Sequence, residues 1–392
     1  MIDIKTLSTN KGALIKKGVS EETIEELEKL YSEYLMVLKQ QESKQSELNI
    51  LSKNYKENAE KCSEVKSELL ILKNQLTVAK AKYELILFGI PNYPSSDVPE
   101  GLSEDDNKII RYILEPKEFT APKNHMDITD EISSELGAKL AGSRFSVLSG
   151  RVAKLERALI NYMLDYNSKA GYSEVSVPYI VNDTAMFGTG QLPKFEEDLY
   201  CVDDMYLIPT AEVPLTNLYA DMILDKADLP IMLTAHTPSF RKEAGSGGKD
   251  TVGIFRQHQF HKVEIVQITD NESSDEALSD MVDHVSGMLV ELGLPHRIVD
   301  LCGGDLGFSA NRTFDIEVYI PSQGKYREIS SISNMTDFQS RRAKIRYKDD
   351  GNKLCHTLNG SSLAVGRTII AIMENFQTEQ EFEIPECLKK YL

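Results

Sequence analysis

The sequence predicts an α+β protein in which an antiparallel sheet forms the larger domain and an N-terminal antiparallel coiled coil forms the smaller one. Two apolar stripes with alternating steps of three and four residues fall within the first 90 residues. From Leu199 onward, short apolar runs alternate with turns, which is typical of antiparallel strands. We therefore expect a helical domain at 1–90, a linker at 91–101 and a second domain at 102–392.

The two stripes predict a helical hairpin over about 21–86. The polar stretch Ser52–Ser63 separates them and carries no stripe, so the simplest arrangement is two helices packed seam to seam. At about 1.5 Å per residue each helix would be roughly 40 Å long, and the hairpin is expected to project as an arm. A dimerisation or spacer element is the usual role of such a hairpin. The stripe residues are Leu27, Tyr31, Tyr34, Leu38, Gln41, Gln45 and Leu48, then Val65, Leu69, Leu72, Leu76, Ala79, Tyr83 and Ile86.

Three prolines in Ile90–Gly101 end the helical pattern, because proline blocks the continuation of a helix. Beyond this linker, Ser149–Ala170 has the periodicity of an amphipathic helix and leads into the extended segment Gly171–Asn182. Further helices are expected at Ser274–Leu292 and Ser362–Asn375. The expected strands are MYLIP, IMLTAH, FRQHQF, EIVQI, TFDIEVYI and YREISSIS.

Composition limits the possible functions. The 392 residues, 41% of them hydrophobic, suffice for a sizeable core. A net charge of -17 argues against indiscriminate binding to nucleic acid or membranes, so a polyanion must meet a local basic patch. The five cysteines are scattered and never spaced as C-x-x-C, which predicts neither a disulfide framework nor a zinc module. Because no stretch has the apolar length that spans a bilayer, we expect a cytoplasmic protein without membrane contact.

The stretch Pro238–Glu264 reads as two strands joined by a loop rich in glycine and lysine. Alternation places Arg241 and Glu243 on one face of the first strand. Guanidinium groups fit phosphate oxygens, an aromatic ring can stack on a base, and carboxylates can hold a metal or an ammonium group. The face could thus hold a nucleotide and an amine-bearing partner, although a salt-bridged sheet face is the simpler alternative. Its members on the second strand are Arg256, His258, Phe260, Lys262 and Glu264.

This stretch, FRKEAGSGGKDTVGIFRQHQFHKVE, resembles motif 2 of class II aminoacyl-tRNA synthetases in the form found in seryl-tRNA synthetases of the bacterial and eukaryotic type. IPTAEVPLTN at Ile208–Asn217 and TLNGSSLAVGRTIIAIMENFQ at Thr357–Gln377 agree in order and spacing. Gly171–Asn182 with its preceding helix resembles motif 1. The resemblance covers essentially the whole chain and implies the class II catalytic fold, ATP-dependent ligase activity and a homodimer formed through motif 1.

The resemblance also implies a serine pocket. Thr210 and Glu212 are two residues apart, so on a strand both would point the same way. In the family the matching Thr-Ala-Glu holds serine, and Glu264 is similarly placed to bind its hydroxyl. The implied serine-binding residues are Thr210, Ala211, Glu212, Glu264, Asn359 and Ser361.

The implied ATP site combines motif 2, the segment YREISSISN and motif 3. Arg241, Glu328 and Arg367 match the family's catalytic residues, and Mg²⁺ is expected with ATP at Glu328 and Ser331. No zinc is expected, because His258 and His261 would lie on opposite faces of a strand. The ATP-binding residues implied by the resemblance are Arg241, Lys242, Glu243, Arg256, Phe260, Glu328, Ile329, Ser330, Ser331 and Arg367.

The implied reaction is activation of L-serine by ATP to seryl-adenylate, followed by transfer to the 3' end of tRNA(Ser). The expected tRNA contacts are the coiled-coil arm and the motif 2 loop. The arm has lysines among glutamates but no arginine, since the first arginine of the chain is Arg111. Departures from the family pattern are Lys249 and Val252 in the motif 2 loop, Gly304, and Ser362.

Two alternatives to an ordinary seryl-tRNA synthetase stay open at this point. One is a serine-activating paralogue with altered or lost tRNA charging. The other is a non-catalytic, synthetase-like binding or regulatory protein, which would have no need to keep Arg241, Glu243, Glu264, Glu328 and Arg367 together.

Overall fold

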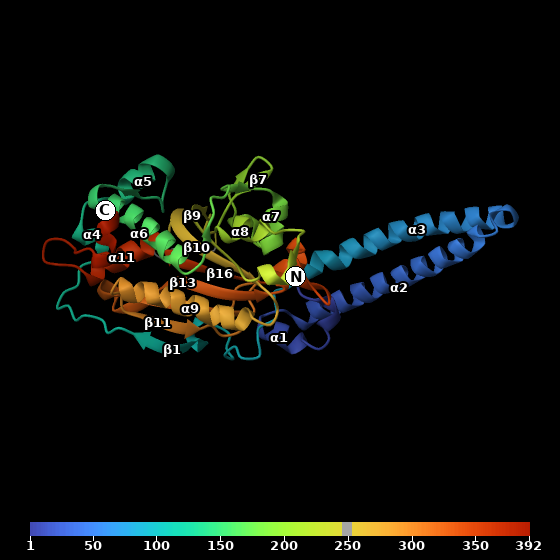
Figure 1. Cartoon of the computed structure of the whole chain (residues 1–392), viewed down its shortest axis with the longest axis horizontal. Helices are drawn as coiled ribbons and strands as arrows, with labels where there is room; N and C mark the ends of the chain where they lie inside the picture. Colours follow the sequence, from blue (N-terminus) through green and yellow to red (C-terminus); the bar gives the residue numbers. More distant parts are fainter. Residues whose placement is uncertain (245–252) are drawn as a thin grey trace. The chain divides into compact units, whose positions relative to one another are not determined.

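The computed structural model describes residues 1–244 and 253–392. The chain divides into two compact units, Met1–Pro91 and Asn92–Leu392. Residues that follow the division already belong to the second unit: the amide of Asn92 donates to the carbonyl oxygen of Phe308 and that of Ser95 to Asn311. Figure 1 shows the elements of both units, coloured along the sequence.

The first unit consists of η1 (Ile4–Thr6), α1 (Lys11–Lys16) and two long helices, α2 (Glu21–Ser52) and α3 (Tyr55–Leu87). Ser20 caps α2, because its hydroxyl accepts a hydrogen bond from the amide of Thr23 at 3.2 Å. The long helices lie side by side as an antiparallel hairpin (Figure 1). At 1.5 Å per residue each is about 50 Å long, longer than expected.

The connection between the long helices differs from the prediction. Only Lys53 and Asn54 separate them, whereas the sequence predicted a break over Ser52–Ser63. The polar residues from Tyr55 onward form the solvated first turns of α3, and a helix needs no apolar seam there once the rest of it is packed.

The predicted seams do face each other in the hairpin. Val65, Leu69 and Tyr83 of α3 are buried. The rings of Tyr31 and Tyr34 of α2 contact the Tyr83 ring, with centroid distances of 5.5 and 5.0 Å. The heptad prediction is therefore confirmed for residues in both helices.

The second unit is built on an eight-stranded sheet with the order β1-β11-β12-β13-β16-β10-β9-β4. Every neighbouring pair is antiparallel except β4 and β9, which are parallel. This confirms the predicted antiparallel sheet. The strands are β1 (Lys108–Ile113), β4 (Ser173–Glu174), β9 (Ile231–Phe240), β10 (Gln259–Thr269), β11 (His296–Asp300), β12 (Arg312–Ile320), β13 (Lys325–Thr336) and β16 (His356–Ala364).

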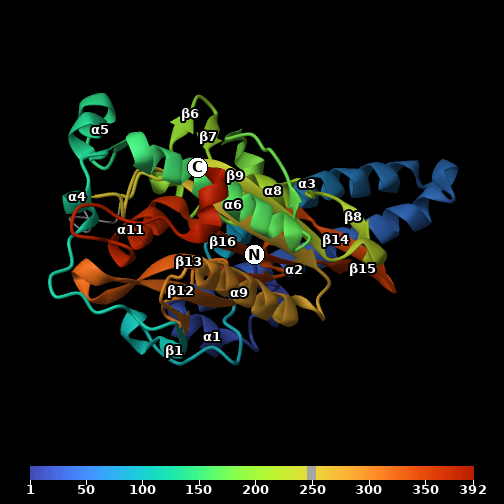
Figure 2. The same cartoon turned by 60° about the vertical axis from the view of Figure 1, so that its left-hand side comes forward.

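Three helices cover one face of this sheet: α6 (Gly150–Lys169), α9 (Ser274–Glu291) and α11 (Val365–Asn375). Their apolar residues form one buried cluster with residues of β10, β12, β13 and β16, including Met163, Leu289, Ile370 and Ile316. Figure 2 shows the three helices lying over these strands. The core therefore sits on the helix-covered side of the sheet and leaves the opposite side for other elements.

The smaller elements surround the sheet. The helices and 3-10 turns among them are η2 (Glu104–Asp106), α4 (His125–Ile128), α5 (Ser134–Ala141), α7 (Asp183–Thr189), η3 (Glu196–Asp198), α8 (Glu212–Asn217), η4 (Lys226–Asp228), η5 (Pro321–Gln323), α10 (Phe338–Ala343) and η6 (Glu386–Tyr391). The short strands are β2 (Ile132–Ser133), β3 (Val147–Leu148), β5 (Ile180–Val181), β6 (Cys201–Val202), β7 (Met205–Leu207), β8 (Ile223–Asp225), β14 (Arg346–Asp349) and β15 (Gly351–Leu354).

Two predicted boundaries were wrong. The strand expected over FRQHQF begins only at Gln259, because β9 ends at Phe240 and these two residues are the last pair in the ladder. Ser362, expected at the start of the last helix, lies in β16, and α11 begins at Val365. Within the two described ranges, no helix is both long and apolar enough to cross a membrane.

Candidate active site

A cavity of about 700 Å³ opens in the second unit beside the ends of β9 and β13. Its lining includes five residues expected to bind ligands, namely Thr210, Glu212, Arg241, Glu243 and Arg256. The remaining walls are Thr189, Gly190, Gln191, Phe195, Asp198, Leu199, Pro209, Gly307, Phe308, Ser309, Ala310, Ser333 and Met335. The structure thus brings the residues that follow β9 together with Thr210 and Glu212 of the Thr-Ala-Glu segment.

Glu212 is the most deeply held carboxylate of this cavity. Its Oε1 accepts hydrogen bonds from Gln339 Nε2 at 2.6 Å and from Asn359 Nδ2 at 3.0 Å. Burial and the nearby carboxylate of Glu264 raise the pKa of Glu212 to about 7, while Gln339, Lys262 and Arg241 act in the opposite direction. Asn359 is therefore in contact with Glu212, as a shared serine pocket requires.

The local conformation around Thr210 and Glu212 was predicted wrongly. Glu212 is the first residue of α8, so the pair does not lie on a strand. The hydroxyl of Thr210 accepts a hydrogen bond from the amide of Glu212 at 3.3 Å, and this turn brings both side chains to the cavity. The expected proximity was right although the geometry behind it was not.

Glu264 reaches this group through Lys262, which the sequence placed on the same strand face without assigning it a ligand. Lys262 Nζ lies 2.5 Å from Glu264 Oε2 and donates a hydrogen bond to Thr210 Oγ1 at 2.8 Å. The side chains of Lys262 and Glu264 are only 8% and 2% exposed. The two-residue spacing that places Lys262 and Glu264 on one face of β10 was the signal that could have identified this contact.

The arginine side of the cavity is ordered by contacts to backbone and ring. Arg241 Nε donates to the carbonyl oxygen of Pro209 at 3.2 Å, and its guanidinium carbon lies 5.2 Å from the centre of the Phe260 ring. Glu243 adopts a φ of 53° and pairs with Arg256, with 3.1 Å between Oε2 and Nε. Arg241 and Phe260 therefore meet across the hairpin. The prediction that Arg241 and Glu243 lie on one face of the first strand was wrong, because β9 ends at Phe240 and both residues follow it.

Arg367 and Glu328 form a second group, which is outside the lining of the cavity. Arg367 Nη1 donates to the carbonyl oxygen of Glu328 at 2.8 Å and lies 3.4 Å from its Oε1. Arg367 Nε also donates to the carbonyl oxygen of Phe255 at 3.3 Å. Arg256 lines the cavity and directly follows Phe255. The hydrogen bond to Phe255 therefore links Arg367 to the residue next to the cavity wall.

The remaining predicted residues are distributed between the sheet and its surface. The side chain of Ile329 is buried in the core cluster, so only its backbone can contact a ligand. The hydroxyl of Ser330 donates to the carbonyl oxygen of Ser361, and Ser361 pairs with Glu264 in the ladder. Lys242 is anchored by its amide, which donates to Asp198, and its ammonium group lies 6.0 Å from the Tyr200 ring.

The residues expected to hold Mg²⁺ have suitable chemistry. Glu328 offers a half-exposed carboxylate, and Ser331 lies opposite Asp315 in the ladder. Asp315 Oδ1 is buried, and no described residue hydrogen-bonds to it. Burial and the Glu328 carboxylate raise the pKa of Asp315 well above its usual value. Hard oxygen donors of this kind fit Mg²⁺ when phosphate oxygens complete the shell.

Two departures from the family pattern have structural consequences. Ser362 faces α6, where its hydroxyl donates to Asn167 Oδ1 at 3.1 Å, so it does not shape the cavity. A Cβ at Gly304 would lie 2.4 Å from Leu102 Cα, so a threonine does not fit there. Lys249 and Val252, with the rest of the motif 2 loop from 245 to 252, lie outside the described residues.

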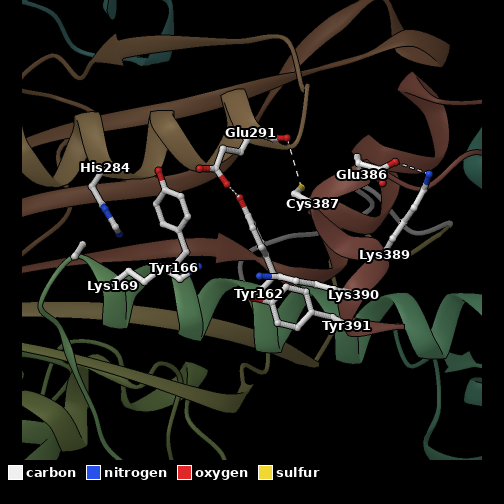
Figure 3. Close-up of a pocket in the computed structure, with 11 residues that line it drawn as sticks. Tyr162, Tyr166, Lys169, His284, Glu291, Glu386, Cys387, Lys389, Lys390 and Tyr391 are labelled. Carbon is white, nitrogen blue, oxygen red and sulfur yellow. Dashed lines mark hydrogen bonds and ion pairs between the residues drawn. The ribbon is translucent and has the colours of Figure 1, made fainter.

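A second cavity, of about 880 Å³, lies between α6, α9 and the C-terminal turn (Figure 3). Tyrosine rings and lysines line it, and Tyr162 donates a hydrogen bond to Glu291 at 3.0 Å. None of the predicted site residues lines it. We therefore assign the catalytic chemistry to the smaller cavity.

The comparisons with known proteins identify the family of the chain. Residues 194–376 match the family model of the tRNA synthetase class II core domain (G, H, P, S and T). The fold and this match define a class II aminoacyl-tRNA synthetase, a ligase. The serine–tRNA ligase of Nitratiruptor sp. is 51% identical over 414 residues, covering 100% of both chains. The chain therefore belongs to the serine–tRNA ligase family.

Solved structures show the same relationship. A seryl-tRNA synthetase from Pyrococcus horikoshii complexed with ATP superposes with a TM-score of 0.93 at 36% identity, covering 100% of this chain and 98% of that one. The cytoplasmic serine–tRNA ligase of Naegleria fowleri in complex with AMP has a TM-score of 0.90 at 29% identity, with coverage of 100% and 97%.

Proposed function

We propose that this cavity activates L-serine with ATP to seryl-adenylate and that the enzyme then transfers the seryl group to the 3' end of tRNA(Ser). The observation that carries the proposal is the contact of Glu212 with Asn359 beside the Arg241 guanidinium. The ATP and AMP complexes of the two related structures support ATP as the co-substrate.

Serine recognition would use the buried polar groups of the pocket. The carboxylate of Glu212 is suited to the substrate ammonium group. The Thr210 hydroxyl, which accepts from Lys262 and from the amide of Glu212, can donate to the substrate hydroxyl, and Glu264 can accept from it. Alanine would leave Glu264 without its partner, and a pocket of that type disfavours the analogue by about 10⁴-fold or more. Ala211 is buried in the apolar cluster beneath these residues, Asn359 contributes through its hydrogen bond to Glu212, and Ser361 lies opposite Glu264 in the ladder.

Activation requires alignment more than acid–base chemistry. A carboxylate oxygen of serine attacks the α-phosphorus of ATP, a new oxygen–phosphorus bond forms, and the bond to pyrophosphate breaks. The carboxylate is already ionised at neutral pH, so no general base is needed. Arg241 and Arg367 stabilise charge on the transferring phosphate. Arg256 binds near the γ-phosphate, Glu243 contributes to the same ATP site, and Phe260 offers a stacking surface for adenine.

Glu328 and Ser331 would hold Mg²⁺ together with ATP oxygens. The ion would supply charge neutralisation on the phosphates. The backbone of Glu328–Ser331 fixes these two residues in the ladder of β12 and β13, and the Lys242 amide ties the segment after β9 to Asp198. In the second step a ribose hydroxyl of the tRNA attacks the seryl carbonyl carbon, and AMP leaves.

The helical hairpin and the motif 2 loop are proposed as the tRNA contacts, and motif 1 as the interface of a homodimer. Exposed lysines on α2 and α3 offer local positive charge on an otherwise acidic chain. A serine-specific enzyme also needs a contact that distinguishes its tRNA by shape, which a long helical arm can provide.

The test combines two assays on the purified full chain. Serine-dependent ATP–pyrophosphate exchange reports adenylation, and charging of transcribed tRNA(Ser), with and without its variable arm, reports transfer. We expect exchange with serine but not alanine, and charging that falls when the variable arm is removed. Exchange without charging would instead favour a paralogue with another acceptor, and the absence of both activities a non-catalytic protein.

A further inference from the structure

Lys262 is a buried cation that lies behind Thr210, one of the residues that line the cavity. It lies in β10 between β9 and β16, and its side chain is 8% exposed. Its ammonium group contacts Glu264 Oε2 at 2.5 Å and Thr210 Oγ1 at 2.8 Å. A buried ammonium group is costly unless it is paired and hydrogen-bonded, so these two contacts hold Lys262 in one position.

The contacts of Lys262 fix the direction of hydrogen bonding at Thr210. The threonine oxygen accepts from Lys262 Nζ and from the amide of Glu212. A hydroxyl has two acceptor lone pairs and one donor proton, so its remaining capacity is to donate. Glu264, held by the same ammonium group, remains an acceptor. The pocket therefore offers a ligand one hydrogen-bond donor, the Thr210 hydroxyl, and one acceptor, the Glu264 carboxylate.

Lys262 also determines the charge of the pocket. Glu212 and Glu264 are both buried. The Glu264 carboxylate disfavours ionised Glu212, while Lys262 and Arg241 favour it. When Glu212 is ionised, two carboxylates with one buried lysine leave one negative charge for a ligand to neutralise. An amino acid with a single ammonium group and a neutral side chain has this complement, and Arg241 remains available for its carboxylate or for a phosphate.

We propose that Lys262 is a positioning residue that sets the charge and hydrogen-bond sense of the serine pocket, and through them its selectivity for a hydroxylated amino acid. The inference rests on the proposed function of the same cavity. It assigns no bond-making step to Lys262, which acts through Thr210 and Glu264.

The first test is Lys262→Met, which keeps most of the side-chain volume and removes the charge. In ATP–pyrophosphate exchange we expect the KM for serine to rise by about 10- to 100-fold and the KM for ATP to change by less than about twofold. The matched control is Lys348→Met, because Lys348 is exposed on β14 and distant in sequence from the site. An unchanged KM for serine in Lys262→Met would overturn the proposal.

The pH profile separates this role from simple structural support. Ionised Glu212 is needed to bind the ammonium group, and the charged groups facing it are Glu264, Lys262 and Arg241. As pH falls, the KM for serine should rise around a midpoint pH. Lys262→Met should shift this midpoint to higher pH, whereas Lys262→Arg should leave it near the wild-type value. A midpoint that stays unchanged in Lys262→Met would contradict the proposal.

The remaining outcomes are also decisive. If Lys262→Met does not fold, Lys262→Gln keeps a donor for both partners without the charge, and the same shift in pH midpoint is expected. ATP-induced thermal stabilisation identifies folded variants without requiring catalysis. Wild-type protein without serine-dependent exchange would refute the proposed function itself, whereas an active wild type with unaltered variants would refute only the role of Lys262.

Discussion

The guanidinium group of Arg241 rests on the face of the Phe260 ring, with 5.2 Å between its central carbon and the ring centre. Arg241 follows the last residue of β9, and Phe260 is the second residue of β10, so the contact crosses the hairpin. The ring thereby limits the positions open to the guanidinium group, whose Nε also donates a hydrogen bond to the carbonyl oxygen of Pro209.

Phe260→Leu should therefore weaken ATP use without unfolding the protein. Loss of a cation–π contact of about 0.5–2 kcal/mol corresponds to roughly a 2- to 30-fold fall in kcat/KM for ATP. The measurement is exchange at saturating serine. An effect confined to the KM for serine would contradict this role of the ring.

The ionisation of Glu212 predicts a pH dependence of serine binding. Its pKa is about 7, so the fraction of ionised carboxylate falls as pH decreases through 7 and the KM for serine should rise. Glu212→Gln should raise this KM at every pH and remove the dependence. Exchange assays between pH 6 and 8.5 measure both effects.

The same substitution has a predicted effect on stability. Because the pKa of this carboxyl is raised in the fold, unfolding releases a proton between about pH 4.5 and 7. The free energy of unfolding therefore decreases as the pH rises from about 4.5 to 7. Above pH 7, Glu212→Gln should not destabilise the protein and is expected to raise the free energy of unfolding by up to about 3 kcal/mol. A marked loss of Tm at pH 8 would show that the hydrogen bonds from Gln339 and Asn359 to Glu212 contribute more to stability than burial of the ionised carboxylate costs.

Gly253, the first described residue after the motif 2 loop, cannot carry a side chain. Its φ is +80°, and a Cβ would lie 2.3 Å from Nε2 of the buried His125. Gly253→Ala should lower stability by at least about 1–2 kcal/mol from backbone strain alone and reduce exchange, because Arg256 and Phe255 follow directly. Gly303→Ala is the control, since a Cβ there has no neighbour within 4 Å. Equal Tm values for the two variants would exclude the predicted clash.

The parts of the fold and of the candidate site that have a regular residue period could be predicted from the sequence. The heptad steps located the seam of Leu69 and Tyr83, and alternation placed Phe260, Lys262 and Glu264 on one face of β10. These residues lie inside regular elements, where spacing and direction are linked.

The failures arose where tertiary contacts replace a regular period. Thr210 and Glu212 meet through a turn at the start of α8. Gln339 belongs to α10 and reaches Glu212 from 127 residues away in sequence, and no local pattern indicates it. The start of β10 depends on where β9 ends, so the position of Arg256 could not be deduced from its own segment.

Two partly buried histidines predict that the protein loses stability in acid. Burial lowers the pKa of His236 to about 4, with a further contribution from His261, whose Nδ1 lies 2.9 Å from His236 Nε2. The unfolded chain binds protons more readily between about pH 6.5 and 4, so stability is present above 6.5 and is lost as pH falls through this window. Tm should fall between pH 7 and 5, and His236→Gln should reduce that fall. An identical fall in the variant would assign the effect to other groups, such as His284.

The arm makes a prediction about which lysines bind tRNA. Lys44 contacts Glu47 at 3.0 Å and Glu68 at 2.8 Å, so its charge is already compensated within the hairpin. Lys61 and Lys73 are exposed on α3, and no ion pair of either is found with any residue of Met1–Pro91. Lys61 and Lys73 should therefore be more available than Lys44 to RNA phosphates, although all three lie within one helical hairpin.

Lys61→Ala and Lys73→Ala should each weaken tRNA(Ser) binding and reduce the slope of log K against log salt by about 0.7–0.9, because each phosphate contact releases about that share of a counterion. Lys44→Ala is the matched control and should leave the slope nearly unchanged. Exchange without tRNA should be normal in all three variants, since the adenylation site lies in the other unit. Equal slopes for the wild type and all three variants would show that these arm lysines do not contact the tRNA backbone.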